Sequence, residues 1–473
     1  MIAPNDRIFF APATRQAELV RRREISPVEL MQATLERIAT VDRRLNAFVA
    51  LRREDEMLAD ARAVEQRIAR GDDPGPLAGL PLGVKDLEDA AGLPNTHGSL
   101  LFRDHVATGD TIQVERLRRA GAIVVGKTNA PEFGYTCFTT NRLFGPTRNP
   151  WNLERTPGGS SGGSSAAVAG GLVALATASD GGGSVRIPAA YTGLVGLKPT
   201  QGRIPWGPDE MLRHSACIVS GPLTRSVADA ALWLDVTAGP HSLDPFSLPA
   251  PEARYQDLLE RDPGRLRIGW SPTLGYARPE KQVRREVEKA VAALADAGHE
   301  VDEVDPGFPD VVLHWMQYLV FEDLAFLAPY LTDESLLDPG YLPGLGIARA
   351  ATPESFGQVM RIRSELVAKL ADVFARFDLL ATPTCATTAF AAEGPLPIEV
   401  DGRPIETPGG GVAYTYPFNF TGNPAISLRA GFGDDGLPVG LQLVAPRLRE
   451  DLLLRVAAQL ERSRPWADAW PAV

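Results

Sequence analysis

The chain has 473 residues, of which 44% are hydrophobic, and its formal net charge is −11. This composition supports a large buried core and excludes a chain that is disordered throughout. The surplus of acidic residues also argues against a general binder of nucleic acids or anionic membranes, because phosphate contacts need a surplus of Lys and Arg.

Cysteine usage and the N-terminal composition indicate the cellular compartment. The three cysteines, Cys137, Cys217 and Cys385, lie far apart and form no paired motif. They fit free thiols in a reducing compartment better than a disulfide framework or a zinc knuckle. Residues 1–20 lack the apolar run of a signal peptide, and no window approaches the ~18 apolar residues of a membrane span. We therefore expect a cytoplasmic protein.

Predicted helices and strands alternate along the chain. The first pattern begins at Ser26, where an N-cap serine, Pro27 at the first helical position and Glu29 fit a capping box. The later segments are 54–70 (helix), 80–86 (strand), 113–120 (helix), 122–125 (strand), 194–197 (strand), 226–238 (helix), 267–270 (strand), 283–297 (helix) and 451–462 (helix). Such alternation predicts an α/β sheet covered by helices.

One long segment, 313–331, is rich in aromatic and apolar residues. Packing in the core and formation of a substrate-pocket wall both explain this composition, and the sequence leaves the two interpretations open. Its aromatic residues are Trp315, Tyr318, Phe321, Phe326 and Tyr330.

Several motifs match the sequence only by chance. Residues 121–128 fit the GxxxxGK[ST] pattern of a phosphate-binding loop, but an apolar strand pattern stands where that loop needs flexible residues. Residues 158–162 fit G-x-S-x-G, yet no strand leads into this turn as a nucleophile elbow requires. The six histidines lie in no base motif, and the sequence holds no metal-ligand pattern. Nucleotide binding, a Ser-His-Asp triad and a metal hydrolase are therefore disfavoured.

Two clusters rich in glycine and serine, 158–165 and 180–186, flank a segment whose Ala, Val and Leu content indicates burial. Tight turns that bring hydroxyls and backbone N–H groups together beside a core are suited to acyl transfer. Lys85 ends a short buried strand pattern, where desolvation can leave a lysine neutral and able to accept a proton. A surface ion pair between Lys85 and Asp86 is the alternative, and residue chemistry alone leaves the two interpretations equal.

Further motifs extend over nearly the whole chain. They are Gly79-Leu80-Pro81-Leu82-Gly83-Val84-Lys85-Asp86, Gly126-Lys127-Thr128-Asn129, Asn149-Pro150-Trp151-Asn152, Gly193-Leu194-Val195-Gly196-Leu197-Lys198-Pro199-Thr200 and Gly436-Leu437-Pro438-Val439-Gly440-Leu441-Gln442. Together with the serine-rich clusters, they resemble the amidase signature family from about Ile25 to Arg462. The resemblance implies an α/β fold with a large mixed central β-sheet that α-helices cover on both faces. It also implies a single domain over residues 1–473.

The resemblance further implies a catalytic triad. Ser184 corresponds to the nucleophile, Ser160 to a bridging serine that follows a cis peptide bond, and Lys85 to the base. In the mechanism that this implies, neutral Lys85 accepts a proton through Ser160, which deprotonates Ser184 for attack on an amide carbonyl. Water then cleaves the acyl-enzyme, and the reaction needs no cofactor and no metal.

Residues around the nucleophile take supporting parts in the implied mechanism. The backbone N–H groups expected to form the oxyanion hole are those of Gly181, Gly182, Gly183 and Ser184. Ser161 and Arg186 are expected to support the network through hydrogen bonds, and Asp180 is expected to hold the turn.

The substrate pocket is expected in a variable region, about 310–416, outside a catalytic core of about 75–235. The turn 180–184 has a glycine where many family members have Thr. In this it resembles the subgroup of bacterial aryl acylamidases, cyclic-oligoamide hydrolases and urethane-cleaving amidases. An apolar, aryl, oligoamide or carbamate substrate is therefore expected. The candidate pocket residues are Tyr135, Cys137 and Phe144.

Two alternative functions remain open. The glutaminase component of the tRNA-dependent amidotransferase, its A subunit, is related, but it usually carries Gln where this chain has Ile187, followed by Pro188. A non-catalytic binding homologue is the second alternative, and the presence of all three triad residues argues against it. The expected partner is a small-molecule amide substrate, with no nucleic acid and no membrane partner, and the expected assembly is a monomer or homodimer.

Overall fold

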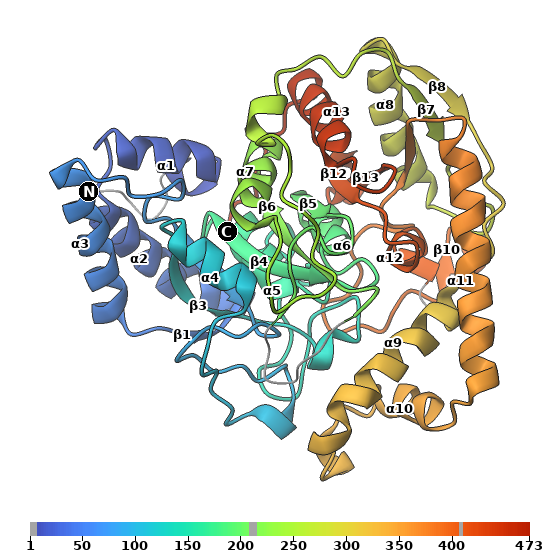
Figure 1. The fold of residues 1–473 in the computed structure, drawn as a ribbon, viewed down its shortest axis with the longest axis horizontal. Coiled ribbons are helices and arrows are strands. Elements are labelled where there is room, and N and C mark those ends of the chain that lie inside the picture. Colours follow the sequence, from blue (N-terminus) through green and yellow to red (C-terminus); the bar gives the residue numbers. More distant parts are fainter. Residues whose placement is uncertain (1–6, 208–214, 406–409) are drawn as a thin grey trace.

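The computed structural model describes residues 7–207, 215–405 and 410–473 (Figure 1). Within these residues the helices are α1 (Ala13–Arg21), α2 (Pro27–Leu45), α3 (Glu54–Arg70), α4 (Ile112–Arg119), α5 (Gly162–Ala169), α6 (Arg186–Thr192), α7 (Val227–Thr237), α8 (Lys281–Asp296), α9 (Val312–Leu327), α10 (Leu342–Arg349), α11 (Pro353–Phe374), α12 (Tyr416–Phe420) and α13 (Glu450–Ser463). The strands are β1 (Phe48–Leu51), β2 (Pro81–Lys85), β3 (Ile123–Thr128), β4 (Leu175–Asp180), β5 (Val195–Lys198), β6 (Val219–Thr224), β7 (Arg267–Trp270), β8 (Glu300–Glu303), β9 (Leu379–Pro383), β10 (Glu399–Val400), β11 (Arg403–Pro404), β12 (Ala425–Phe432) and β13 (Pro438–Val444).

One large sheet of eleven strands organises the molecule, in the order β1-β3-β2-β4-β6-β5-β12-β13-β9-β7-β8. Strand β2 runs parallel to β3 and β4, and β7 runs parallel to β8 and β9. The other neighbouring pairs, such as β4–β6 and β12–β13, are antiparallel. The sheet is therefore mixed, as the family resemblance implies, and its strands come from almost the whole length of the chain.

The start of α2 shows how local sequence sets an element boundary. The Ser26 hydroxyl accepts the backbone N–H of Val28 at 3.0 Å and that of Glu29 at 3.5 Å. The Glu29 carboxylate accepts the N–H of Ser26 in return, so the predicted capping box is confirmed. Asn46, in the left-handed conformation, ends the helix.

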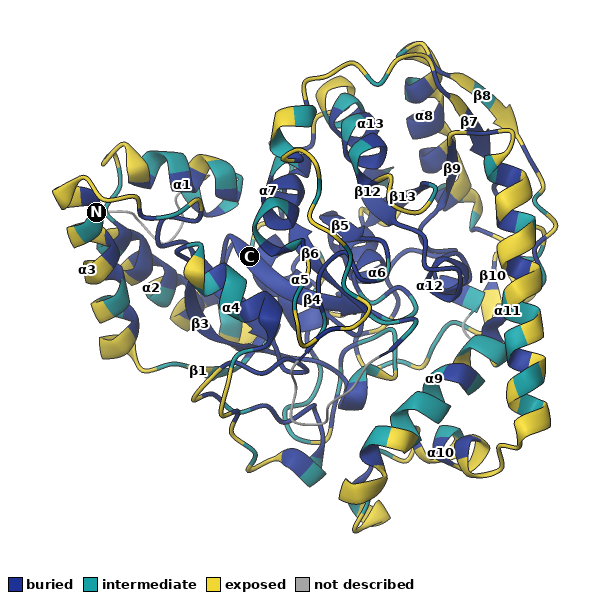
Figure 2. Ribbon diagram, viewed as in Figure 1, coloured by how far each residue is buried: buried dark blue, intermediate teal, exposed yellow. Residues whose placement is uncertain are grey.

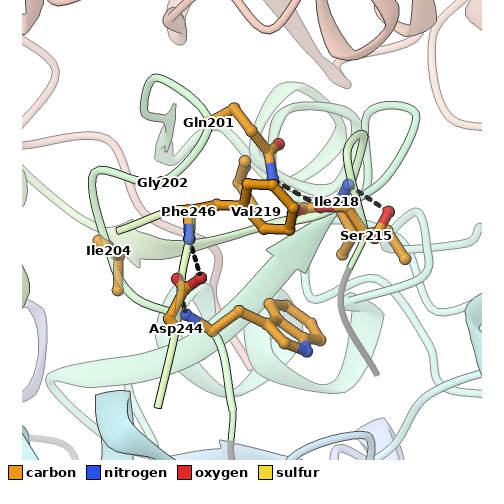
Figure 3. Close-up of a pocket in the computed structure, with 9 residues that line it drawn as sticks. Gln201, Gly202, Ile204, Ser215, Ile218, Val219, Asp244 and Phe246 are labelled. Carbon is orange, nitrogen blue, oxygen red and sulfur yellow. Dashed lines mark hydrogen bonds between the residues drawn. The ribbon is translucent and has the colours of Figure 1, made fainter. Parts of the chain in front are cut away.

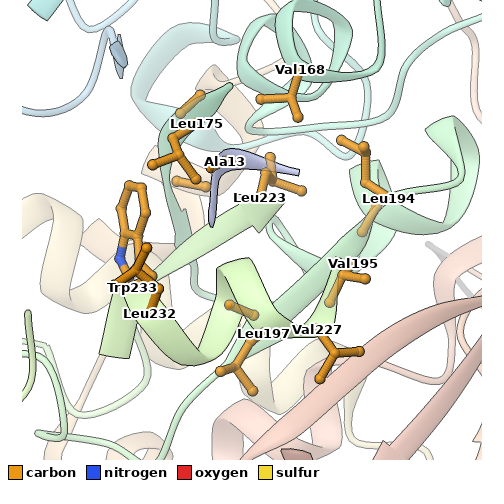
Figure 4. Close-up of a cluster of buried hydrophobic side chains, with 14 of the residues drawn as sticks. Ala13, Val168, Leu175, Leu194, Val195, Leu197, Leu223, Val227, Leu232 and Trp233 are labelled. Carbon is orange, nitrogen blue, oxygen red and sulfur yellow. The ribbon is translucent and has the colours of Figure 1, made fainter. Parts of the chain in front are cut away.

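Helices pack on both faces of the sheet, as strand β5 illustrates. A Cβ on Gly196 would lie 2.5 Å from the Cβ of Ala189, so α6 packs directly on this side. Because successive residues of a strand point to opposite faces, Val195 and Leu197 point to the other side. There they join a buried apolar cluster with Val227 of α7 (Figure 4). The predicted cover of helices on both faces is thus confirmed.

The sheet is deeply buried away from its two edge strands, β1 and β8. Strands β2, β3 and β4 are buried along their full length, whereas α9, α10 and α11 alternate between exposed and buried residues (Figure 2). In the part of the chain that the structure describes, no helix combines the length and apolar character needed to cross a membrane.

The predicted elements are present with small shifts at their ends. The strand predicted at 80–86 is β2, and the pattern at 121–128 leads into the buried strand β3, in agreement with the exclusion of a phosphate loop. The aromatic segment 313–331 forms most of α9 and a following 3-10 turn. His214 and residues 406–409 of the predicted pocket region lie outside the described residues.

Candidate active site

Lys85 is the last residue of β2, and its side chain is completely buried. Its Nζ donates to the hydroxyl of Ser160 at 2.8 Å and to that of Ser179 at 3.0 Å. The carboxylate of Asp86 instead lies 3.9 Å from the Nζ of Lys127, another buried lysine. The surface ion pair between Lys85 and Asp86 is therefore excluded, and the lysine faces the serine-rich loop.

Ser179 comes from β4, a strand in which polar residues alternate with alanine. Thr177 and Ser179 point to one face, and the alanines beside them point to the other. The Thr177 hydroxyl accepts the backbone N–H of Lys85 at 2.9 Å, beside the contact of Ser179 with the ammonium. Neither Thr177 nor Ser179 is among the residues predicted from the sequence. Their signal was present, because two hydroxyls at alternate positions of a buried strand need polar partners on that face.

Ser160 lies in a loop whose backbone is tightly enclosed. The peptide bond between Gly159 and Ser160 is cis, the geometry that the family resemblance implies. A Cβ on Gly159 would lie 2.6 Å from the backbone nitrogen of Phe138, so only glycine fits there. The hydroxyl of Ser161 donates to the carbonyl of Ser179 at 3.4 Å and ties this loop to β4.

The turn between β4 and α6 carries Ser184 and is organised by Asp180. The Asp180 carboxylate accepts the N–H of Gly183 at 2.7 Å and that of Val185 at 3.2 Å. It also forms a fully buried ion pair with Arg186 at 2.9 Å. Burial alone would raise the pKa of the Asp180 carboxyl, but the Arg186 charge outweighs it and holds that pKa well below its usual range. The ionised carboxylate therefore holds the turn.

Arg186 joins this turn to the C-terminal part of the chain. Its guanidinium donates to the carbonyl of Thr415 at 2.9 Å, to Oε1 of Gln442 at 2.7 Å and to Oδ1 of Asn419 at 2.6 Å. Asn419 in α12 also donates to the backbone carbonyl of Asp180 at 2.8 Å. These partners are not predicted from the sequence, since they lie between 229 and 256 residues from Arg186 along the chain.

Ser184 is half-buried in the turn. Its hydroxyl forms no hydrogen bond to any residue that the structure describes, so a contact from Ser160 to Ser184 stays a prediction. The N–H of Gly183 is occupied by Asp180 and is not available to a substrate, contrary to the prediction for that residue. The N–H groups of Gly181, Gly182 and Ser184 have no acceptor within the described ranges. Three of the four predicted oxyanion-hole donors are therefore unoccupied.

The three candidate pocket residues have different surroundings. Tyr135 is exposed, and its hydroxyl donates to Asp338 at 2.8 Å. Cys137 adjoins the loop of the bridging serine, and burial raises the pKa of its thiol to about 12, so it is neutral and a poor nucleophile. The carbonyl of Phe144 accepts from Asn46 at 2.8 Å, which closes its loop against the end of α2.

The aromatic segment reaches the nucleophile turn through Trp315, in the first turn of α9. Its indole N–H donates to the carbonyl of Gly181 at 2.8 Å, and a Cβ on Gly182 would lie 2.0 Å from its ring. The ring stacks on Tyr416 with centroids 5.4 Å apart. Leu319, one turn further along α9, faces Gly181 as well. This placement favours the pocket-wall interpretation for the start of the segment.

A small cavity beside β6 adjoins the same turn (Figure 3). Its volume is about 10 Å³, which accommodates about one water molecule and no amide substrate. One of its lining residues, Ile218, would also contact a Cβ placed on Gly181. The cavity therefore belongs to the packing behind the turn rather than to a binding site.

The site as a whole contains the groups that acyl transfer requires. A serine lies on a turn with unoccupied N–H groups, and a buried lysine is hydrogen-bonded to a second serine. Across residues 7–207, 215–405 and 410–473, no group of His, Cys, Asp and Glu side chains is arranged to hold a metal ion.

Comparisons with known proteins agree with this geometry. A family model described as Amidase matches residues 29–454. An acylamidase from Rhodococcus erythropolis is 39% identical over 98% of both chains, and the glutamyl-tRNA(Gln) amidotransferase A subunit of Acidothermus cellulolyticus is 37% identical over 95% of this chain and 93% of its own. The crystal structure of a bacterial aryl acylamidase of the amidase signature family superimposes with a TM-score of 0.90 at 31% identity, over 97% of both chains. The resemblance inferred from the motifs is confirmed.

Proposed function

The chain belongs to the amidase family of amide-hydrolysing enzymes, and from this premise we propose that Ser184 attacks the carbonyl carbon of a carboxylic amide, with Ser160 and Lys85 as its proton relay. The observation that carries the proposal is the 2.8 Å hydrogen bond from the buried Nζ of Lys85 to the hydroxyl of Ser160. A buried lysine joined to a serine hydroxyl is the arrangement that lets an amine act as a base rather than as a surface charge.

The proton moves along three groups in this proposal. Neutral Lys85 accepts the proton of Ser160, and Ser160 takes the proton of Ser184 as the Ser184 oxygen bonds to the carbonyl carbon. The hydroxyl of Ser179, 3.0 Å from Nζ, keeps the lysine in place. When the C–N bond breaks, the proton returns along the same path to the leaving nitrogen, because an amine leaves poorly as an anion.

The negative charge that develops on the carbonyl oxygen needs hydrogen-bond donors. The N–H groups of Gly181, Gly182 and Ser184 supply them in the proposed mechanism, and a single donor of this kind is worth about 10²- to 10³-fold in kcat. Water then attacks the acyl-enzyme with the same relay as its base. This releases the acid and restores Ser184.

The proposed substrates are amides with an apolar or aryl group, and carbamates and cyclic oligoamides are related candidates. Trp315 and Leu319 present indole and aliphatic surface beside the nucleophile turn. Apolar surface of this kind selects apolar or aromatic groups. The similarity to two proteins described as acylamidases supports the same substrate class.

The glutaminase alternative is disfavoured by Ile187. Its side chain is buried and would contact a Cβ placed on Gly183, so it lies directly against the nucleophile turn. A hydrocarbon at this position cannot donate or accept a hydrogen bond to the polar amide of a glutamine substrate. The family similarity to the amidotransferase component therefore does not extend to this contact.

A comparison of substrates tests the proposal. We expect the purified chain to release 4-nitroaniline from short acyl 4-nitroanilides with a kcat/KM at least about 100-fold above that for ammonia release from glutamine. The Ser184→Ala variant is the background control. Release of ammonia from glutamine without cleavage of any anilide, carbamate or cyclic amide would support the amidotransferase function instead. Binding of an amide without turnover would support the non-catalytic homologue.

A further inference from the structure

Every carbonyl of the turn 180–183 is held by a donor. The carbonyl of Asp180 accepts from the side chain of Asn419, and that of Gly181 accepts from Trp315. The carbonyl of Gly182 accepts from the Thr415 hydroxyl at 2.6 Å. The remaining carbonyl, of residue 183, accepts the backbone N–H of residue 187 at 2.7 Å.

These contacts decide where the N–H groups of the turn point. None of the peptide bonds of the turn is cis, and in a trans peptide the C=O of one residue and the N–H of the next point in opposite directions. The donor that holds the carbonyl of Gly181 therefore orients the N–H of Gly182. The peptide between Gly182 and Gly183 is held at both ends. Its C=O accepts from the Thr415 hydroxyl, and its N–H donates to the Asp180 carboxylate.

The peptide between Gly181 and Gly182 depends on one side chain for its orientation. Its N–H has no acceptor among the described residues, and its C=O is held by the indole of Trp315. The position of the indole ring is fixed by Tyr416, on which it stacks at an interplanar angle of 20°. The Tyr416 hydroxyl in turn donates to Asp310 at 2.9 Å. The indole donor is thus locked in place before any substrate arrives.

We propose that Trp315 is a positioning residue that directs the N–H of Gly182 toward the substrate oxygen, so that α9 sets the oxyanion hole as well as the pocket wall. This inference rests on the proposed acyl-transfer function of the same turn. Trp315 does not touch the reacting atoms in this account; it acts by fixing one peptide plane. Loss of its N–H should therefore weaken binding of the transition state more than binding of the substrate.

The test compares two tryptophans that make matching hydrogen bonds. Trp315→Phe keeps an aromatic ring against Tyr416 but loses the N–H. Trp151→Phe is the matched control, since Trp151 is also half-buried and donates its indole N–H to a backbone carbonyl, that of Thr192, at the same 2.8 Å. Acyl 4-nitroanilide turnover and inhibition by phenylboronic acid, which forms a tetrahedral adduct with an active serine, are measured for both.

For Trp315→Phe we expect kcat to fall about tenfold to a hundredfold with KM changed less than about threefold, and the boronate inhibition constant to rise in parallel with the loss of kcat. For Trp151→Phe all three constants stay within about twofold. Unchanged kcat and boronate affinity in Trp315→Phe, or equal losses in both variants, would overturn the inference. If the wild-type chain neither cleaves an anilide nor binds the boronate, the proposed function itself fails.

A second substitution keeps the test valid if Trp315→Phe does not fold. Replacing Trp315 with β-(3-benzothienyl)alanine preserves the shape of the ring and removes only the N–H. The expected loss of kcat and of boronate affinity is the same as for phenylalanine. Wild-type values for this variant would show that the ring matters by packing alone and would contradict the inference.

Discussion

The two ends of the active site are built from different parts of the chain. The proton-relay end joins Lys85 to Ser160 and Ser179, which come from buried strands and a loop in the first 180 residues. The oxyanion end is a turn whose carbonyls are held by donors from the C-terminal part of the chain, chiefly Trp315 and Thr415. The first end is part of the core of the sheet, and the second end depends on distant segments that pack against it.

This difference has a consequence for catalysis and specificity. Residues of the relay can change only with the core around them, because Lys85, Ser160 and Ser179 are all buried. Trp315, which holds the carbonyl of Gly181, lies in α9 together with Leu319 of the proposed pocket wall, so the same helix contributes to both features. We therefore expect substitution of a pocket-wall side chain such as Leu319 to alter KM, whereas loss of the Trp315 N–H and substitutions in the relay lower chiefly kcat.

The largest expected effect is the loss of the nucleophile. Ser184→Ala should lower kcat for an acyl 4-nitroanilide by about 10⁴-fold or more, because no other group can form the acyl-enzyme. Ser364→Ala is the control, since the exposed Ser364 hydroxyl donates to the carbonyl of Met360 within α11 at 2.9 Å. Residual turnover of Ser184→Ala above a few per cent of the wild type would place the nucleophile elsewhere.

The next predicted effect shows whether Lys85 acts as a base or through its positive charge. Lys85→Met and Ser160→Ala should each lower kcat by about 10³-fold, and the double variant should be little worse, because members of one catalytic unit are not additive. Lys85→Arg should be as inactive as Lys85→Met, since an arginine keeps the charge but does not release its proton. Substantial activity in Lys85→Arg would mean that the residue acts through its charge.

A smaller effect is expected at the oxyanion end. Thr415→Val removes the donor to Gly182 but keeps the shape, and the other end of that peptide remains held by Asp180. We expect kcat to fall about fivefold, the value of one net hydrogen bond. Thr421→Val is the control, because the buried Thr421 hydroxyl has no partner in the described part of the chain. Equal kcat values for the two variants would contradict the role of Thr415.

The smallest effect concerns stability rather than turnover. Burial, with the nearby Arg186 charge, lowers the pKa of Lys198 to about 7, while an unfolded lysine keeps its proton up to about pH 10.4. Between these values the unfolded state binds more protons, so stability rises with pH. The unfolding free energy of the wild type relative to Lys198→Met should therefore rise from pH 7 toward pH 10 and stay flat below pH 7. Denaturant unfolding at pH 6, 7.5 and 9 measures it, and a constant difference would contradict the lowered pKa.

More of the proton-relay end than of the oxyanion end could be predicted from the sequence. Lys85 and Ser160 were found because motifs and local patterns carry them, and the strand of Lys85 is where the pattern placed it. Ser179 was missed although its alternation with alanine was readable. The hydrogen bond from the N–H of Gly183 to the Asp180 carboxylate could not be predicted, because it depends on the conformation of the Asp180 side chain.

The contacts of Trp315 were out of reach for a different reason. The segment was recognisable as apolar, but its contact with Gly181 arises only after α9 packs beside α12 and the nucleophile turn. Composition gives the class of such a residue and not its partner. Long-range side-chain contacts to backbone carbonyls carry no periodicity, so the sequence holds no local signal for them.

The activation of Ser184 by Lys85 is tested most directly by treating the protein with a small fluorophosphonate and measuring intact mass and peptide masses. We expect one adduct per chain, on Ser184, and a rate of labelling that falls by about 10³-fold in Lys85→Met. An adduct on another residue, or equally fast labelling of Lys85→Met, would contradict the relay. No adduct on the wild type, under conditions in which the chain is folded, would contradict an activated serine altogether.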